Sequence, residues 1–140
     1  SDHFESLDID TVISPAVGGI VIGTDVGRVM GKCTIFAERE NGKMTLRRGF
    51  TIKPGEKVLV VEDVITTGGS VKEVMNVVDA FGGIVMGVAV IVDRSNGTVA
   101  LHKNQFSLVP MEVLSYEESK IPKELEAIPT TKPGSRSLKK

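Results

Sequence analysis

Short runs of apolar, β-branched residues alternate along the chain with stretches of helical periodicity. Residues 11–14 (TVIS) and 33–37 (CTIFA) are predicted to be strands, and residues 20–30 have the spacing of a helix. The order strand, helix, strand favours parallel strands joined by helical crossovers. We therefore predict an α/β fold with a parallel sheet and helices on both of its faces.

Glycines recur every four residues through the first predicted helix and would lie along one of its faces: Gly19, Gly23, Gly27 and Gly31. A stripe without side chains lets a helix approach a sheet closely. The alternative, a seam between membrane helices, is disfavoured because Asp25 and Arg28 interrupt the segment.

Residues 57–63 (KVLVVED) have the composition of a buried parallel strand, and a helix is predicted from Val71. Its apolar face consists of Val71, Val74, Met75, Val78 and Phe81, and Gly82-Gly83 ends it. The segment Asp63 to Ser70 thus joins the carboxyl end of a strand to the start of a helix. Open parallel sheets bind ligands in the crevice at that edge.

The residue types in this junction suit a phosphate group. Gly68 and Gly69 allow the backbone to approach an anion closely, and Thr66, Thr67 and Ser70 add hydroxyl donors. The amides and the dipole at a helix start also favour negative charge. We predict a phosphate cradle here.

Glu62 and Asp63 would repel a phosphate, but they can accept hydrogen bonds from sugar hydroxyls or hold a hydrated Mg²⁺. A ligand with vicinal hydroxyls and a phosphate fits both halves of the motif. The alternative is that Thr66 or Ser70 only caps the helix and the glycines only turn the chain. Capping leaves the acidic pair without a role, so we prefer the ligand site.

Residues 38–57 carry two turn signals, Asn41-Gly42 and Pro54-Gly55, around an alternating stretch, which predicts an exposed hairpin arm. Five basic residues stand against two acidic ones between residues 38 and 53. A solvated loop and a functional basic arm explain this segment equally well when it is taken alone.

Composition sets the outer bounds. A chain of 140 residues with 41% hydrophobic and 25% charged residues is expected to form one compact domain. Its net charge of -1 argues against a general electrostatic grip on nucleic acid or on an anionic membrane. The apolar runs are shorter than the ~20 residues of a membrane span.

Cys33 is the single cysteine, which excludes an intrachain disulfide and favours the cytoplasm. His3 and His102 are isolated from it in the sequence, so we expect no protein-built zinc site.

The stretch VLVVEDVITTGGS resembles the 5-phosphoribosyl-1-pyrophosphate (PRPP) motif of the type I phosphoribosyltransferases. Within that superfamily, four other segments resemble orotate phosphoribosyltransferases: ISPAVGG, FAEREN through LRRGF, VDRSNG and IPTTKPGSR. The similarity runs from about Asp10 to the C-terminus.

This resemblance implies a type I phosphoribosyltransferase core with a protruding flexible arm. It implies transfer of a phosphoribosyl group from PRPP to orotate, giving orotidine 5'-monophosphate and pyrophosphate, with Mg²⁺ bound mainly through PRPP. The implied PRPP contacts are Ala16, Val17, Gly18, Gly19, Arg39, Lys43, Glu62, Asp63, Thr66, Thr67, Gly68, Gly69 and Ser70.

Three of these residues, Arg39, Lys43 and Asp63, are implied to be catalytic, with the arm reaching the neighbouring site of a homodimer. Thr66 and Arg94 are implied to contact orotate; a surface pair between Arg94 and Asp93 is the alternative for the arginine. Two positions depart from one branch of the family, which has lysine where Gly18 stands and often histidine where Thr45 falls. The grip on pyrophosphate is then expected to depend on Lys43, Arg47 and Arg48.

We expect a single core domain over residues 1–140, with residues 1–9 ending a preceding helix and residues 130–140 forming a flexible tail. We also expect the chain to lack the N-terminal hood that covers the base in that family. Two other functions stay open: a phosphoribosyltransferase acting on a purine base, and a non-catalytic PRPP-binding regulator.

Overall fold

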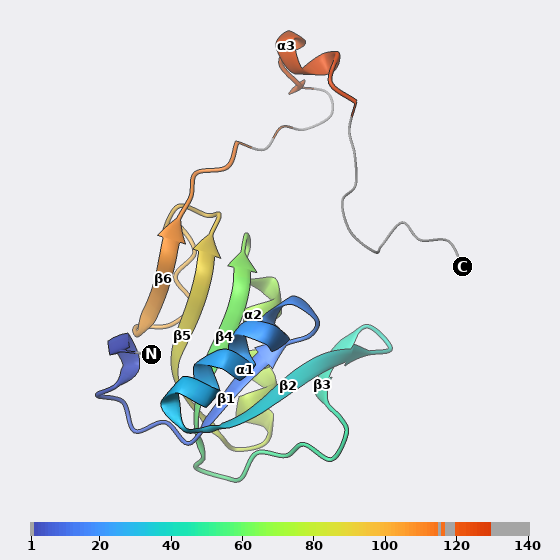
Figure 1. Cartoon of the computed structure of the whole chain (residues 1–140). Helices are drawn as coiled ribbons and strands as arrows, with labels where there is room; N and C mark the ends of the chain where they lie inside the picture. Colours follow the sequence, from blue (N-terminus) through green and yellow to red (C-terminus); the bar gives the residue numbers. More distant parts are fainter. Residues whose placement is uncertain (1, 115, 117–119, 130–140) are drawn as a thin grey trace.

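One sheet of six strands organises the described part of the chain, residues 2–114, 116 and 120–129, in a computed structural model (Figure 1). The strands are β1 (Thr11–Pro15), β2 (Cys33–Glu40), β3 (Lys43–Leu46), β4 (Lys57–Ile65), β5 (Ile84–Asp93) and β6 (Gln105–Pro110). Their order across the sheet is β3-β2-β1-β4-β5-β6, and every neighbouring pair is parallel except β2 with β3. The predicted α/β fold with a mainly parallel sheet is confirmed.

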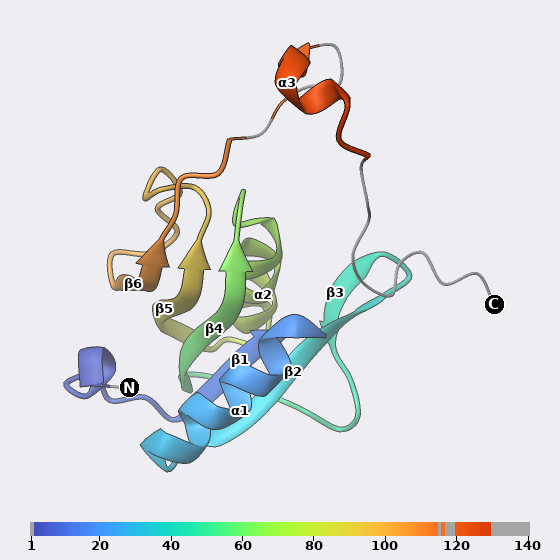
Figure 2. The same ribbon diagram turned by 45° about the horizontal axis from the view of Figure 1, so that its top comes forward.

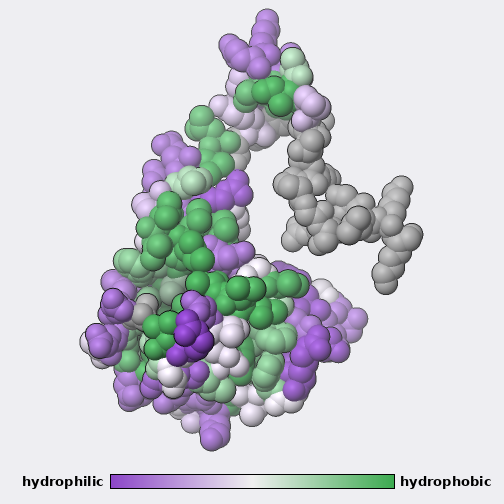
Figure 3. All heavy atoms as spheres, in the orientation of Figure 1, coloured by the Kyte–Doolittle hydropathy of each residue, from purple (hydrophilic) through white to green (hydrophobic). Residues whose placement is uncertain are grey.

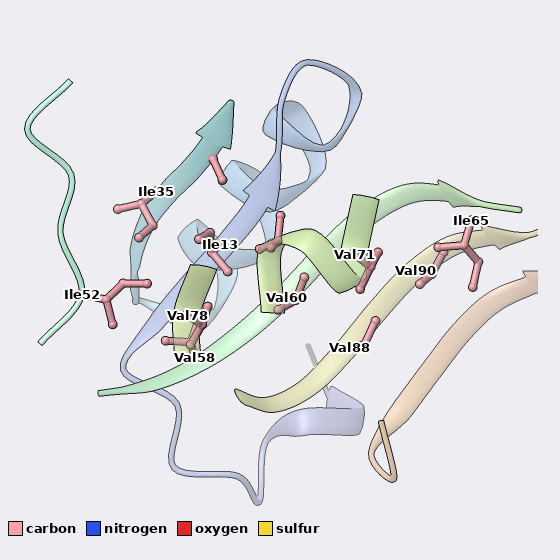
Figure 4. Packing of buried hydrophobic residues seen from close by; sticks show 12 residues of the cluster. Ile13, Ile35, Ile52, Val58, Val60, Ile65, Val71, Val78, Val88 and Val90 are labelled. Atoms are coloured by element: carbon pink, nitrogen blue, oxygen red, sulfur yellow. The ribbon is translucent and has the colours of Figure 1, made fainter. Parts of the chain in front are cut away.

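Helices α1 (Gly18–Met30) and α2 (Gly69–Ala80) cover opposite faces of the sheet (Figures 1 and 2). Strand β1 shows why both faces are apolar: Val12 packs in the cluster on the α1 side and Ile13 in the cluster on the α2 side. Successive side chains of a strand point to opposite faces, so a strand covered twice needs an unbroken apolar run. Figure 4 shows the larger cluster, in which Val71 and Val78 of α2 pack over the sheet.

Both helices begin two residues before their predicted starts, at Gly18 and Gly69 instead of residue 20 and Val71. Glycine adds nothing to an apolar periodicity, so the pattern could not locate these ends. Two short helical segments complete the described chain, the 3-10 turn η1 (Asp2–Phe4) and α3 (Lys123–Glu126). Element η1 lies in the segment that we expected to end a helix, residues 1–9. Its Phe4 is buried and packs against the sheet at Gly87. The tail at residues 130–140 lies outside the described residues.

Three of the four glycines predicted to form a stripe lie against the sheet: Gly19, Gly23 and Gly27 are the buried residues of α1. The prediction was wrong for Gly31, which is exposed and is the left-handed C-cap that ends the helix. A Cβ atom on Gly23 would lie 2.5 Å from Ser14 Oγ, and one on Gly27 would overlap the methyl group of Thr34. The absence of side chains is therefore what lets α1 approach β1 and β2.

Strand β2 runs to Glu40, three residues beyond the predicted strand, because the hairpin continues it. β3 pairs antiparallel with its second half, and Asn41 (φ 50°) with Gly42 (φ 81°) forms the two-residue turn. Residues 47–56 then connect β3 to β4. Figure 1 shows the hairpin at one edge of the sheet.

A first prediction concerns the contact between α1 and the sheet. Replacing Gly23 by Val should lower the free energy of unfolding by about 1–3 kcal/mol, because the new side chain overlaps Ser14. The control is Thr24→Val, which places the same side chain at the next, exposed position and should change stability by about 0.5 kcal/mol or less. Urea unfolding of both variants measures the two changes in stability. Equal losses of stability would contradict the close packing of α1 on the sheet.

Candidate active site

The candidate site lies where the strand order reverses, between β1 and β4. Both strands end at the same edge of the sheet because they are parallel neighbours. β1 leads into the loop Ala16–Gly19, and β4 leads through Glu62 and Asp63 into residues 66–70. This is the switch point at which open α/β sheets bind ligands.

A cavity of about 260 Å³ opens above the start of α2. It is lined by Arg39, Glu62, Val64, Ile65, Thr66, Thr67, Gly68, Gly69, Ser70, Val71 and Glu73. The structure thus brings together the whole predicted phosphate segment, one of the acidic pair and one basic residue of the hairpin.

The start of α2 has no side-chain cap. Its N-cap residue is Gly68, in a left-handed conformation (φ 73°), and no side chain bonds the free amides of the first turn. Among the described residues, no side-chain hydrogen bond engages the hydroxyls of Thr66, Thr67 or Ser70. The capping alternative is therefore wrong for these hydroxyls. Thr66, Thr67 and Ser70 line the cavity beside the free amides of the helix start, so hydroxyls and amides are available there as donors for an anion.

The acidic pair occupies two environments. Glu62 is 7% exposed, while Asp63 is partly exposed. Burial raises the pKa of Glu62 to about 8, and a hydrogen bond with the Asp63 side chain acts in the same direction. Glu62 Oε1 accepts a hydrogen bond from the Asp63 amide at 3.1 Å, and Asp63 Oδ1 accepts one from the Val64 amide at 2.9 Å. With this pKa, Glu62 is largely protonated at neutral pH.

The loop after β1 is pressed against this pair. A Cβ atom on Gly18 would overlap the Asp63 carboxylate, and one on Gly19 would lie 3.0 Å from Glu62 Oε1. The Ala16 amide bonds the Ala37 carbonyl at 2.7 Å, the peptide bond between Ala16 and Val17 is cis, and Val17 is exposed. Two loops separated by more than forty residues in sequence therefore form one wall of the site.

Arg39 and Lys43 lie on different sides of Glu73. Arg39 lines the phosphate-loop cavity, with Nη2 at 2.8 Å from Glu73 Oε2 in an ion pair and Nη1 at 3.2 Å from the Gly42 carbonyl. Lys43 lines a separate groove of about 420 Å³ between the hairpin and α2. In this structure the arm's arginine thus faces the phosphate loop of its own chain. Glu73 was not identified from the sequence, where it is one more charge on a helix surface.

The other two arginines proposed for the arm are paired with hairpin carboxylates. Arg48 Nε lies 3.0 Å from Glu38 Oε1, and Arg47 Nε lies 3.2 Å from Glu40 Oε1. The structure does not bring them to the phosphate-loop cavity.

Arg94 follows β5 at the same edge of the sheet and is exposed. Its amide bonds the Ile65 carbonyl at 2.9 Å, which ties its backbone to the end of β4. The surface pair with Asp93 does not form: Asp93 is buried, and its carboxylate accepts hydrogen bonds from Ser95 and Gly97. Those bonds hold the pKa of Asp93 low even though its burial alone would raise it.

An apolar groove of about 360 Å³ continues from Glu62 across the α1 face of β5 and β6. Ile22, Ile91, Phe106 and Leu108 contribute to it, and the His3 ring stacks on Phe106 with centroids 4.3 Å apart. Figure 3 shows apolar residues gathered on this side of the molecule. A flat organic ring fits such a surface better than a charged group does.

Within the described ranges, no three His, Cys, Asp or Glu side chains gather closely enough to hold a metal ion. Across the same residues, no helix has the length and apolar character needed to cross a membrane.

Comparison with known proteins narrows the interpretation of this geometry. The phosphoribosyl transferase domain model matches residues 1–117. The chain is 62% identical over 135 residues to an orotate phosphoribosyltransferase of Chlorobaculum parvum, covering 96% of this chain and 70% of that protein. It is 56% identical over 136 residues to that of Pelotomaculum thermopropionicum, covering 97% and 72%. The resemblance proposed from the sequence is confirmed.

Solved structures support the fold. An adenine phosphoribosyltransferase of Saccharomyces cerevisiae superposes with a TM-score of 0.66 at 18% identity, over 77% of this chain and 70% of that one. An orotate phosphoribosyltransferase of Aeropyrum pernix superposes with a TM-score of 0.57 at 22% identity, over 76% and 63%. At such identities the likeness shows the fold alone, and it agrees with the family that the domain model gives.

A second prediction follows from the buried Glu62. Its pKa is about 4.5 when unfolded and about 8 when folded, so the folded state binds the proton more tightly. This contribution to stability is fully present below pH 4.5 and is lost as the pH rises toward 8, by at most about 1.4 kcal/mol per pH unit. The side chain in Glu62→Gln does not titrate. Between pH 4.5 and pH 8 the free energy of unfolding of this variant should therefore rise relative to that of the unaltered chain.

Urea unfolding at the two ends of this window measures the effect. Asp79→Asn, at an exposed position of α2, is the control and should run parallel to the unaltered chain. If the stability of Glu62→Gln changed with pH in the same way as that of the unaltered chain, the raised pKa of Glu62 would be contradicted.

Proposed function

The chain belongs to the orotate phosphoribosyltransferase family, and from this membership we propose that it transfers the phosphoribosyl group of PRPP to orotate, forming orotidine 5'-monophosphate and pyrophosphate in pyrimidine biosynthesis. The observation that carries the proposal is the meeting of three elements at one edge of the sheet. They are the uncapped start of α2, the acidic pair of β4 and the loop Ala16–Gly19.

The 5'-phosphate of PRPP binds at the start of α2. The amides of Thr67, Gly68 and Gly69 and the hydroxyls of Thr66 and Ser70 supply donors, and the helix dipole favours the negative charge. Arg39 at the rim of the same cavity adds a positive charge.

The ribose hydroxyls lie on the acidic pair. A protonated Glu62 can donate as well as accept a hydrogen bond, whereas a carboxylate at Asp63 only accepts, so the pair matches two neighbouring hydroxyl groups. This assignment places the sugar between the phosphate cavity and the loop Ala16–Gly19, where the pyrophosphate then lies.

Mg²⁺ fits this arrangement when it arrives with PRPP. The Asp63 carboxylate touches Gly18, so a carboxylate stands beside the proposed pyrophosphate position, and no dedicated metal site competes with it among the described residues. Bound there, Mg²⁺ would offset the charge that the departing pyrophosphate gains.

Catalysis rests on positive charge and on exclusion of water. As the bond from the ribose to pyrophosphate breaks, negative charge grows on the leaving group, and cations placed around it stabilise the transition state more than the ground state. Arg39 and Lys43 supply this charge from the hairpin. Closure of the hairpin would also keep out water that could hydrolyse PRPP.

Orotate binds beside the ribose, along the apolar groove that begins at Glu62. Thr66 offers a hydroxyl at this end, and the planar fork of Arg94 matches the carboxylate of the base. The tie between the Arg94 amide and the Ile65 carbonyl supports this role, because it fixes the arginine near the phosphate segment.

A homodimer is part of the proposal. The hairpin lies at the edge of the sheet and Lys43 is exposed on it, which supports an arm that serves a neighbouring site. A cytoplasmic place of action suits both these substrates and a chain with one cysteine.

Neither alternative function has an observation in its favour. The adenine phosphoribosyltransferases that superpose on the chain are less than 20% identical to it in sequence, so they support the fold alone. A regulator without catalysis would have no need of two basic residues on the hairpin.

A third prediction tests the PRPP site. Asp63→Asn should weaken binding of PRPP with Mg²⁺ by about ten- to a hundredfold, since hydrogen bonds to a charged group contribute about 1.5–3 kcal/mol. Calorimetric titration measures the loss, and Asp79→Asn is the matched control, with unchanged affinity expected. If Asp63→Asn bound PRPP as tightly as the unaltered chain, the acidic pair would not be part of the PRPP site.

A fourth prediction separates the base from the sugar phosphate. Arg94→Gln should raise the KM for orotate by about ten- to a hundredfold through loss of a charged hydrogen bond, and leave PRPP affinity unchanged. Steady-state kinetics with each substrate varied in turn gives both values. A parallel loss for PRPP would mean that Arg94 acts on the phosphate segment and not on the base.

A further inference from the structure

The segment between β5 and β6, residues 94–104 and here called the bracing loop, is folded by side-chain hydrogen bonds at both of its ends. At its start, the buried Asp93 accepts bonds from the Ser95 amide at 2.8 Å, the Ser95 hydroxyl at 2.6 Å and the Gly97 amide at 3.1 Å. The Ser95 hydroxyl oxygen in turn accepts a bond from the Val99 amide at 3.0 Å. These bonds therefore hold the backbone at the start of the loop in a defined conformation.

Gln105, the first residue of β6, holds the far end of this loop. Its Nε2 donates to the Val99 carbonyl at 2.8 Å, and its Oε1 accepts from the Leu101 amide at 2.8 Å. One side chain thereby fixes the backbone on either side of residue 100. All three residues are partly buried, so water replaces these bonds poorly.

The residues fixed by Gln105 press on the phosphate segment. A Cβ atom on Gly68 would lie 2.8 Å from Leu101 Cδ2 and 2.9 Å from Val99 Cγ1, so both side chains pack directly against this backbone. Gly68 is also the N-cap residue of α2 and lines the phosphate cavity. Behind the anion-binding face of the segment there is thus an apolar wall held in place by Gln105.

We propose that Gln105 is a positioning residue for phosphoribosyl transfer. It holds Val99 and Leu101 against Gly68 and so keeps the amides of residues 66–70 aimed at the 5'-phosphate of PRPP. The proposal rests on the function proposed above and deepens it, because the bracing loop also begins with Arg94. Gln105 therefore supports the phosphate segment and the proposed base-binding arginine through one loop.

The physical reason is the conformation of Gly68. With φ at 73° and no side chain of its own, it can relax to other conformations unless its neighbours confine it. No side chain caps the helix start, so confinement has to come from packing. A donor array binds an anion tightly only when it is already arranged before binding.

The experiment compares Gln105→Ala, Gln105→Glu and Asn104→Ala with the unaltered chain. Asn104 is the matched control, since its Nδ2 bonds the Met86 carbonyl at 2.9 Å and so supports the same loop through a hydrogen bond that involves neither Val99 nor Leu101. Gln105→Glu keeps the acceptor for the Leu101 amide but replaces the donor to the Val99 carbonyl by a carboxylate oxygen that repels it, so it should also lose the brace, as Gln105→Ala does.

Two ligands with Mg²⁺ then separate positioning from a general loss of stability. Affinity for ribose 5-phosphate, measured by calorimetry, should fall about five- to tenfold in Gln105→Ala, corresponding to about 1 kcal/mol for the hydrogen bonds lost. Affinity for pyrophosphate should stay unchanged, because its proposed site at Ala16–Gly19 does not touch the bracing loop. Asn104→Ala should leave both affinities unchanged. Equal losses for the two ligands, or no loss for either, would overturn the proposal.

Hydrogen exchange provides a readout that needs no ligand. The Lys72 amide, which bonds the Gly68 carbonyl at 3.0 Å, should exchange faster in Gln105→Ala than in the unaltered chain, and the Ala16 amide, which bonds the Ala37 carbonyl, should not. Unchanged exchange of the Lys72 amide would overturn the brace. If the unaltered chain bound neither ribose 5-phosphate nor PRPP, the proposed function would fail, while the exchange comparison would still decide whether Gln105 holds the segment.

Discussion

The parallel pairing of β1 with β4 is the constraint on which the candidate site depends. It aligns Thr11 with Val58 and Ile13 with Val60, so both strands end at the same edge of the sheet. The loop after β1 then meets the acidic pair that ends β4, at a distance that leaves no room for a side chain on Gly18 or Gly19. An antiparallel pairing would have sent the two loops to opposite ends of the sheet.

Once these loops meet, the electrostatics of the site follow from burial. Glu62 is enclosed by the strands and by α1 and keeps its proton at neutral pH, whereas Asp63 faces the loop Ala16–Gly19. The start of α2 is left without a cap, although a capping side chain contributes about 1 kcal/mol in an ordinary helix. Such local losses of stability are common where a protein keeps polar groups available for a ligand.

The parts around this centre contribute through longer connections. The hairpin is a continuation of β2, and its arginine reaches the phosphate cavity because Glu73 of α2 stands beside it. The segment after β5 carries Arg94 at one end and packs Val99 and Leu101 on Gly68 further along. Both contacts connect the proposed base and pyrophosphate sides of the site to the same helix, α2.

The sequence by itself determined the elements and the chemistry of the central motif. Its apolar runs and helical spacings predicted the strands and helices of the core, and the residues from Glu62 to Ser70 predicted a sugar-phosphate site, since strand, helix and turn preferences act over a few neighbouring residues. The tertiary structure decided which distant residues meet. The contact of Gly18 with Asp63, the ion pair of Arg39 with Glu73 and the hold of Gln105 on the loop behind Gly68 depend on the order of strands in the sheet. That order is set by how all the elements bury their apolar faces together, and no local pattern records it.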